Sequence, residues 1–139
     1  DEAARQLARW LQQQPAIAQV LHPALEGAPG HAHWKALCGA AEGGQGGQGA
    51  AAGLFSVMID ARYTQAQVDA FCDSLRLFKL GYSWGGPMSL VVPYTIASMR
   101  SRPSPHLKPG TLVRFSIGLE AVEDLRRDLQ QAMERAFPA

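Results

Sequence analysis

The sequence predicts an α+β fold, in which a small, largely antiparallel sheet has helices packed on one face. Two observations predict it. Apolar runs of the length typical of strands recur along the chain, and amphipathic segments with helical spacing lie at both ends and in the middle. Such a mixture of elements is expected to form two layers. At 139 residues, the chain is long enough for one domain with its own core.

The N-terminal segment is predicted to form a helix followed by a strand. Apolar residues at helical spacing begin at Ala4, and the helix should end just before Pro15, because proline disfavours helix at the residue preceding it. Residues 17–21 predict a short strand, and residues 24–37 mostly a loop with one helical turn near His33. The first helix starts without a cap, so we expect the chain to be a single domain excised from a longer protein.

Residues 39–53 contain seven glycines and five alanines and are predicted to form a flexible loop. Residues 44–49 match the letters of a dinucleotide-binding fingerprint. That motif requires a preceding strand and a following helix, which are not predicted here. We therefore interpret the segment as a surface loop rather than a nucleotide site.

The rest of the chain supplies most of the predicted sheet. The near-continuously apolar residues 54–59 predict a strand in the sheet interior, and Thr64 to Gln67 have the form of a capping box that starts a helix. A helical turn within 93–99 and a proline-rich loop at 102–110 are also expected. The remaining strands are predicted at 77–82, 88–92 and 112–117. The terminal helix should bury the face formed by Val122, Leu125, Leu129, Ala132 and Ala136.

Composition excludes several classes of function. A net charge of +1 without a basic run gives no indication of nucleic-acid binding. No apolar segment approaches the ~18 residues that a membrane-spanning helix needs. Two cysteines, Cys38 and Cys72, fit free thiols in a reducing cytosol better than a disulfide framework. We expect a cytoplasmic domain that binds neither nucleic acid nor membranes.

Two polar elements interrupt the predicted strands. Ser83-Trp84-Gly85-Gly86 follows an apolar run, and glycines there let the backbone approach a ligand closely. The alternative for these four residues is a hairpin turn with a packing tryptophan. Arg114 lies inside an apolar strand, where a guanidinium needs an anionic partner. That partner is either an internal carboxylate or a bound anion held bidentately.

Read together, these elements resemble the C-terminal domain of the Cys/Met-metabolism family of pyridoxal-phosphate-dependent enzymes, and most of all its cystathionine β-lyase group. The resemblance covers nearly the whole chain in order. The segments that carry it are Val20 to Leu25, Gly30-His31, Trp34-Lys35, Ser83 to Gly86, Val113 to Glu120 and Asp124-Leu125.

The resemblance implies a carbon–sulfur lyase of transsulfuration and methionine biosynthesis, in which pyridoxal phosphate acts as an electron sink. It assigns Arg114 to the substrate α-carboxylate, and it places Ser83 and Trp84 beside that carboxylate. The tryptophan favours β-lyases over γ-lyases and γ-synthases. The implied partners are an amino-acid substrate such as cystathionine or another cysteine S-conjugate, the enzyme's own N-terminal large domain, and further copies in a homotetramer.

The family's catalytic lysine has no counterpart in this chain, whose only lysines are Lys35, Lys79 and Lys108. We therefore expect no catalytic or cofactor-binding residue here, no tight binding of the cofactor and no turnover by the fragment alone. A different class of function is a stand-alone small-molecule-binding or regulatory domain that uses Arg114 as an anion anchor. A third alternative is a zinc site in a loop, with ligands from His31, His33 and Cys38 and a fourth from His22 or His106. The spacing of these residues matches no zinc module. We expect His22 and His31 to make structural hydrogen bonds instead.

Overall fold

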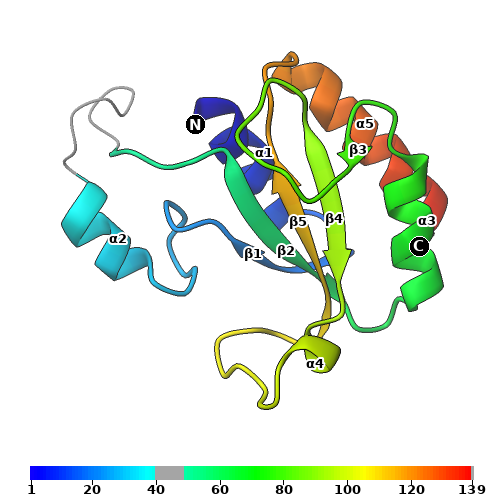
Figure 1. Ribbon diagram of the computed structural model, residues 1–139, viewed down its shortest axis with the longest axis horizontal. Helices are drawn as coiled ribbons and strands as arrows, with labels where there is room; N and C mark the ends of the chain where they lie inside the picture. The colour runs from blue at the N-terminus through cyan, green and yellow to red at the C-terminus, as the bar shows by residue number, and fades with distance from the viewer. Residues whose placement is uncertain (40–48, 139) are drawn as a thin grey trace.

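The structure, a computed structural model, describes residues 1–39 and 49–138. Within these residues, five helices and five strands follow one another along the chain (Figure 1). The N-terminal half contains α1 (Glu2–Gln12), β1 (Ile17–Leu21), α2 (His31–Cys38), β2 (Leu54–Asp60) and α3 (Gln65–Ser74). The C-terminal half contains β3 (Lys79–Leu80), β4 (Leu90–Tyr94), α4 (Ile96–Met99), β5 (Gly110–Ser116) and α5 (Val122–Ala136).

The strands form one sheet in the order β1-β2-β5-β4-β3. All neighbours are antiparallel except β3 and β4, which are parallel. The longest pairing joins β2 to β5 and extends from Leu54 opposite Ser116 to Asp60 opposite Gly110. The predicted small, largely antiparallel sheet of an α+β fold is therefore confirmed, and β2 lies in its interior, between β1 and the middle strand β5.

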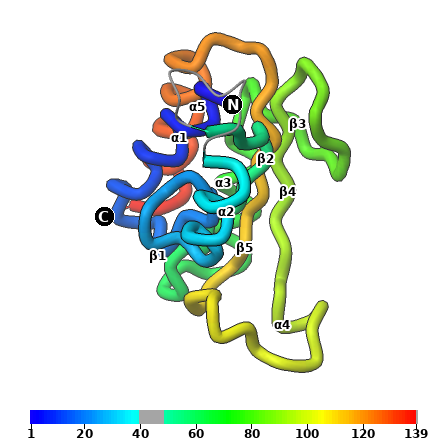
Figure 2. The backbone as a smooth tube through the Cα atoms, turned by 90° about the vertical axis from the view of Figure 1, so that its left-hand side faces the viewer, coloured from blue at the N-terminus to red at the C-terminus, as the bar shows by residue number. Residues whose placement is uncertain are grey.

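Helices α1, α3 and α5 cover one face of the sheet, and Figure 2 shows them as a layer beside the strands. The core lies between the two layers. Alternate residues of β2 and β5 point into it, because successive side chains of a strand lie on opposite faces. These core residues are Phe55, Val57, Ile59, Val113 and Phe115. The helices α2 and α4 lie outside this layer, at one side and at one end of the sheet (Figure 1).

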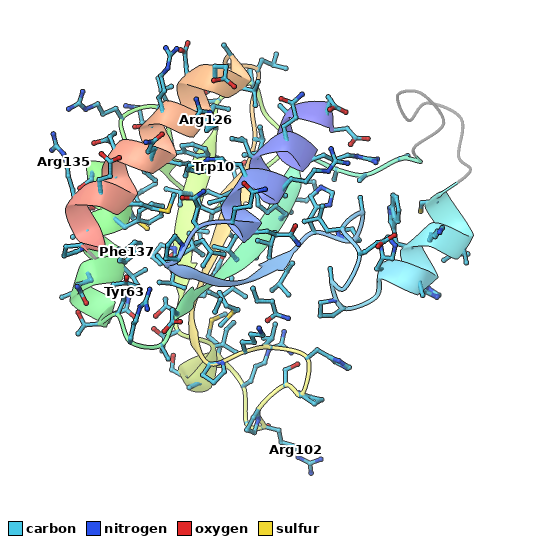
Figure 3. All side chains as sticks on the ribbon, turned by 180° about the vertical axis from the view of Figure 1, so that it is seen from behind. Trp10, Tyr63, Arg102, Arg126, Arg135 and Phe137 are labelled. Carbon is cyan, nitrogen blue, oxygen red and sulfur yellow. The ribbon has the colours of Figure 1, made fainter. Side chains whose placement is uncertain are left out.

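Aromatic rings connect the sheet to the helical layer. Phe115 of β5 lies between Phe55 and Phe78, with ring centroids 5.7 Å and 5.5 Å away. At the end of α5, Phe137 contacts Tyr63 at 4.6 Å between ring centroids, and both lie at the same end of the molecule in Figure 3. Such ring pairs stabilise a core beyond the area that they bury.

The termini of α3 and α5 match their sequence signals. The capping box is present, since the Gln67 N–H donates to Thr64 Oγ1 and the Thr64 N–H donates to Gln67 Oε1. On α5, the predicted apolar face is buried, except that Val122 is only half-buried. Arg126 and Arg135 of α5 point away from the sheet (Figure 3), whereas Asp128 of the same helix is buried.

One segment predicted as mostly loop is a helix. Residues 24–37 were expected to hold a single helical turn, but α2 extends over eight residues and none of them is buried. A helix without a buried face has no hydrophobic periodicity from which to predict it. Gly30, whose φ of 80° suits glycine, is the N-cap residue that precedes it, and Trp34 attaches the helix to the rest of the chain by donating from Nε1 to the Ala50 carbonyl.

The strand predicted at 77–82 is also shorter than expected, because Asp128 binds the backbone before it. Asp128 is only 5% exposed, and its carboxylate accepts hydrogen bonds from the N–H groups of Arg76, Leu77 and Phe78. The shortest of these, from Leu77, is 2.7 Å. These N–H groups therefore do not take part in the sheet, and only Lys79 and Leu80 pair with β4.

We expect Asp128→Asn to lower the free energy of unfolding by about 2 kcal/mol, because an amide accepts these hydrogen bonds without the charge that strengthens them. Asp128→Ala should cost about 3 kcal/mol, since it leaves one buried and two part-buried backbone donors without their acceptor. Urea denaturation followed by circular dichroism measures both. Asp124→Asn on the exposed side of the same helix is the control and should change little. Equal stability of Asp128→Asn and Asp124→Asn would contradict this role.

His22, directly after β1, is a fully buried polar side chain beside Phe55. Its Nδ1 accepts a hydrogen bond from the Ala24 N–H, so Nε2 carries the proton, and Nε2 has no partner among the described residues. Burial, followed by the positive charges of Arg5 and Arg9, lowers the pKa of His22 to about 4. His31 also bonds to the backbone, through Nδ1 and the Pro23 carbonyl.

The His22 pKa predicts a pH dependence of stability. Because the unfolded state takes up a proton near pH 6.5 and the folded state only near pH 4, stability is complete above pH 6.5 and falls as the pH decreases toward 4. The loss attributable to His22 should be on the order of 3 kcal/mol. Denaturation curves at several pH values should show a flatter profile for His22→Phe than for the native chain. The exposed His33→Gln should retain the native profile.

Some predictions lie partly outside the described residues. Of the predicted flexible loop at 39–53, residues 40–48 fall there, as does nearly all of the glycine motif. Among the described residues, Cys38 and Cys72 are both free thiols, and no cluster of three or more histidine, cysteine or acidic residues is arranged to hold a metal. No helix in the described ranges is long and apolar enough to cross a membrane.

Candidate functional site

The face of the sheet opposite the helical layer carries the candidate site. Arg114 lies at the centre of this face, in a row of paired residues with Val92 of β4 on one side and Ser56 of β2 on the other. Ser116, two residues further along β5, lies on the same face. Strand alternation thus places Arg114, which is half-buried, and Ser116, which the loop before β4 covers, on one side of β5, while Val113 and Phe115 are buried in the core on the other.

The Arg114 guanidinium is half-buried and is held from two sides. Nη2 donates a 2.6 Å hydrogen bond to the carbonyl oxygen of Tyr82, and the guanidinium carbon lies 5.7 Å from the ring centroid of Tyr94. In the described part of the chain, no carboxylate forms a salt bridge with Arg114. Among the described residues, the internal salt bridge considered for this arginine is therefore not found, and Nη2 is the guanidinium nitrogen for which a hydrogen bond is observed.

Ser83 and Trp84 lie in the loop that connects β3 to β4. Both are exposed, and Trp84 is 64% accessible. Since β3 and β4 are parallel, this loop is not a hairpin, and its tryptophan does not pack in the core. Gly85 has a φ of 79°, which turns the chain back just after Trp84 and favours glycine.

The loop is attached to β5 on both sides of Ser83 and Trp84. On one side, the carbonyl of Tyr82 accepts from Arg114. On the other, the N–H of Gly85 donates to Ser116 Oγ at 3.1 Å. The structure therefore brings the backbone that carries Ser83 and Trp84 next to the face that carries Arg114.

The end of the loop is also attached to the segment that follows β5. Ser89 is fully buried, and both its N–H and its hydroxyl donate to the carboxylate of Glu120, at 2.9 Å and 2.7 Å. The same hydroxyl accepts from the Gly118 N–H at 2.8 Å. Partial burial raises the pKa of Glu120, but the hydrogen bonds from Ser89 outweigh it, so the pKa lies below its usual value.

The sequence predicts a role for three of these residues, Ser83, Trp84 and Arg114, and for none of the others. Ser116 was recognisable, since it is two residues from Arg114 in a strand and must share its face. The contacts of Tyr82 and Tyr94 with Arg114, and the bond between Ser89 and Glu120, join residues about 20 to 30 positions apart. No local pattern in the sequence indicates such contacts.

Chemically, this arrangement fits the binding of a carboxylate. A guanidinium offers two parallel N–H donors to a carboxylate, a hydroxyl adds a donor, and an indole adds an apolar wall. The same residues do not make a complete site for pyridoxal phosphate. The lysines are placed elsewhere: Lys79 Nζ donates to the Arg76 carbonyl, Lys35 is on α2, and Lys108 lies in the loop before β5.

A family model and curated relatives match the sequence of this chain over nearly its whole length. The family model described as Cys/Met metabolism PLP-dependent enzyme matches residues 1–134. A cystathionine beta-lyase of Salmonella typhimurium is 39% identical over 96% of this chain and 32% of its own length. The cystathionine beta-lyase MetC of Escherichia coli is 36% identical over the same shares.

A solved structure shares the fold. The crystal structure of apo CalE6, a methionine gamma lyase from Micromonospora echinospora, superposes with a TM-score of 0.68 at 28% identity, over 96% of this chain and 30% of that one. The chain spans about a third of the length of the curated relatives that it matches. With the family model matching nearly all of its residues, the chain belongs to the Cys/Met-metabolism family of PLP-dependent enzymes.

Proposed function

We propose that this chain is the C-terminal small domain of a PLP-dependent carbon–sulfur lyase of the cystathionine β-lyase type, and that it supplies the residues that bind the substrate carboxylate. The observation that carries the proposal is the position of Arg114. Its guanidinium lies on the open sheet face, is bonded to the residue before Ser83, and forms no salt bridge among the described residues.

The physical role of such an arginine is orientation. Breaking a bond β to an amino acid's Cα begins with loss of the Cα proton, and the substrate must be held so that this C–H bond is correctly directed. Two donors in a rigid fork fix both the position and the rotation of the α-carboxylate, which contributes several kcal/mol to catalysis. We assign this role to Arg114, with Ser83 and Trp84 beside the same carboxylate.

The remaining parts of the site would come from other segments of the same enzyme. We propose that an N-terminal large domain holds pyridoxal phosphate and supplies the lysine that carries it, and that the enzyme is a cytoplasmic homotetramer of methionine biosynthesis. The exposed positions of Ser83 and Trp84 support this proposal, since a substrate held only by this chain would remain open to water. The substrate class is an amino-acid thioether such as cystathionine.

Two alternatives stay open. The likeness to a methionine gamma lyase supports a γ-elimination on the same scaffold. A stand-alone binding or regulatory domain would use Arg114 as an anion anchor without chemistry. The two differ in their products, because a γ-lyase releases α-ketobutyrate from cystathionine whereas a binding domain releases nothing.

In the full-length enzyme, we expect Arg114→Lys to lower kcat/KM for cystathionine by about 100-fold or more, because a single ammonium cannot reproduce the planar fork. Trp84→Ala should reduce it less. Steady-state release of pyruvate and thiol, with pyridoxal phosphate added, measures both. Arg126→Lys on the outer side of α5 is a matched control and should be active. Near-normal turnover of Arg114→Lys would show that the assignment is wrong.

For the 139-residue chain alone, we expect no turnover and no tight binding of pyridoxal phosphate. The reason is that none of its three lysines is placed beside Arg114. Titration with the cofactor, followed by visible absorbance and by dialysis, tests the expectation. A retained absorbance band that disappears in a single lysine variant would contradict it and indicate a cofactor site within this chain.

A further inference from the structure

The geometry points to Glu120 as a positioning residue for the substrate-binding loop, acting through Ser89; this inference rests on the function proposed above. Glu120 lies four residues after the end of β5 and makes no contact with Arg114 in the structure. Its role would be to hold the end of the loop that carries Ser83 and Trp84.

The first support is the way in which the Glu120 carboxylate is used. One oxygen accepts from the Ser89 N–H and the other from the Ser89 hydroxyl, so both oxygens bind a single residue. The hydroxyl in turn accepts from the Gly118 N–H. A charged acceptor makes such hydrogen bonds roughly twice as strong as neutral ones, and Ser89 is shielded from water.

The second support is the close approach of the two backbones. The N–H of Leu119 donates to the Pro87 carbonyl at 2.8 Å. A Cβ on Gly118 would collide with the same carbonyl oxygen and would lie 2.7 Å from Glu120 Oε1. Gly118 is thus required by lack of space, and the end of the loop fits directly against the segment that contains Glu120.

The third support is that the loop has few hydrogen bonds to the rest of the chain. Residues 82–88 are all exposed. Within the described residues, the hydrogen bonds that attach this stretch to the rest of the chain come from β5 and the residues just after it: to Tyr82, Gly85 and Pro87. An exposed loop with few attachments becomes mobile when one is removed, and a mobile loop must be ordered each time substrate binds.

The expected effect is therefore on substrate affinity rather than on the chemical step. In full-length enzyme, Glu120→Gln should raise KM for the amino-acid substrate about tenfold and leave kcat within about threefold, since the bound loop regains its geometry. Glu123→Gln, an exposed glutamate three residues later that pairs with Arg126, is the matched control and should keep both constants.

A second measurement does not depend on catalysis. In the 139-residue chain, amide hydrogen exchange at Ser89 and Gly118 should be about tenfold faster in Glu120→Gln and unchanged in Glu123→Gln. If Glu120→Gln folds poorly, Ser116→Ala serves as the second variant, because it removes only the attachment at Gly85. It should likewise raise KM with little change in kcat.

The outcomes separate the two proposals. If Arg114→Lys loses activity but both Glu120→Gln and Ser116→Ala have a native KM, the proposed function stands and the positioning role is overturned. If Arg114→Lys is fully active, the proposed function fails and the positioning role falls with it, whatever the exchange rates show. A raised KM with native kcat, together with faster exchange at Ser89, supports the inference.

Discussion

The arrangement of this domain depends on alternation along its central strand. β5 pairs with β2 on one side and β4 on the other, so its side chains lie alternately on the two faces of the sheet. Val113 and Phe115 enter the core beneath the helices, which leaves Arg114 and Ser116 on the open face. A shift of one residue in the register of β5 would bury the guanidinium of Arg114 and expose the ring of Phe115, and both changes would lower the free energy of unfolding. The buried face therefore fixes where the binding groups are presented.

The same strand also organises the loop that approaches it. The polar groups of β5 and of the segment after it bind the loop between β3 and β4 at Tyr82, Gly85, Pro87 and Ser89. On the opposite side of the sheet, Asp128 of α5 binds the backbone that leads into β3. The loop is thus held at its entry by a buried carboxylate and at its exit by Glu120. Two carboxylates, Asp128 and Glu120, thus hydrogen-bond the chain before and after the loop that carries Ser83 and Trp84.

The open face is consistent with a domain that completes a site rather than contains one. Its residues offer a cation, a hydroxyl and an indole, which together recognise a carboxylate. The three lysines of the chain lie elsewhere, on α2, on β3 and in the loop before β5. The proposed function accordingly assigns to this chain the orientation of the substrate carboxylate.

The sequence by itself determined the fold class, the capping box at Thr64 and the buried face of α5, because these depend on local periodicity and local hydrogen bonding. The roles of Ser83, Trp84 and Arg114, which rest on motif resemblance, stay predictions. Tertiary structure alone decided the shortness of β3, the helix α2, and the attachment of Ser89 to Glu120. Each of these depends on a partner distant in the chain: Asp128 for β3, Ala50 for α2 and Glu120 for Ser89. A side chain that hydrogen-bonds a remote residue leaves no periodic trace in the sequence on either side.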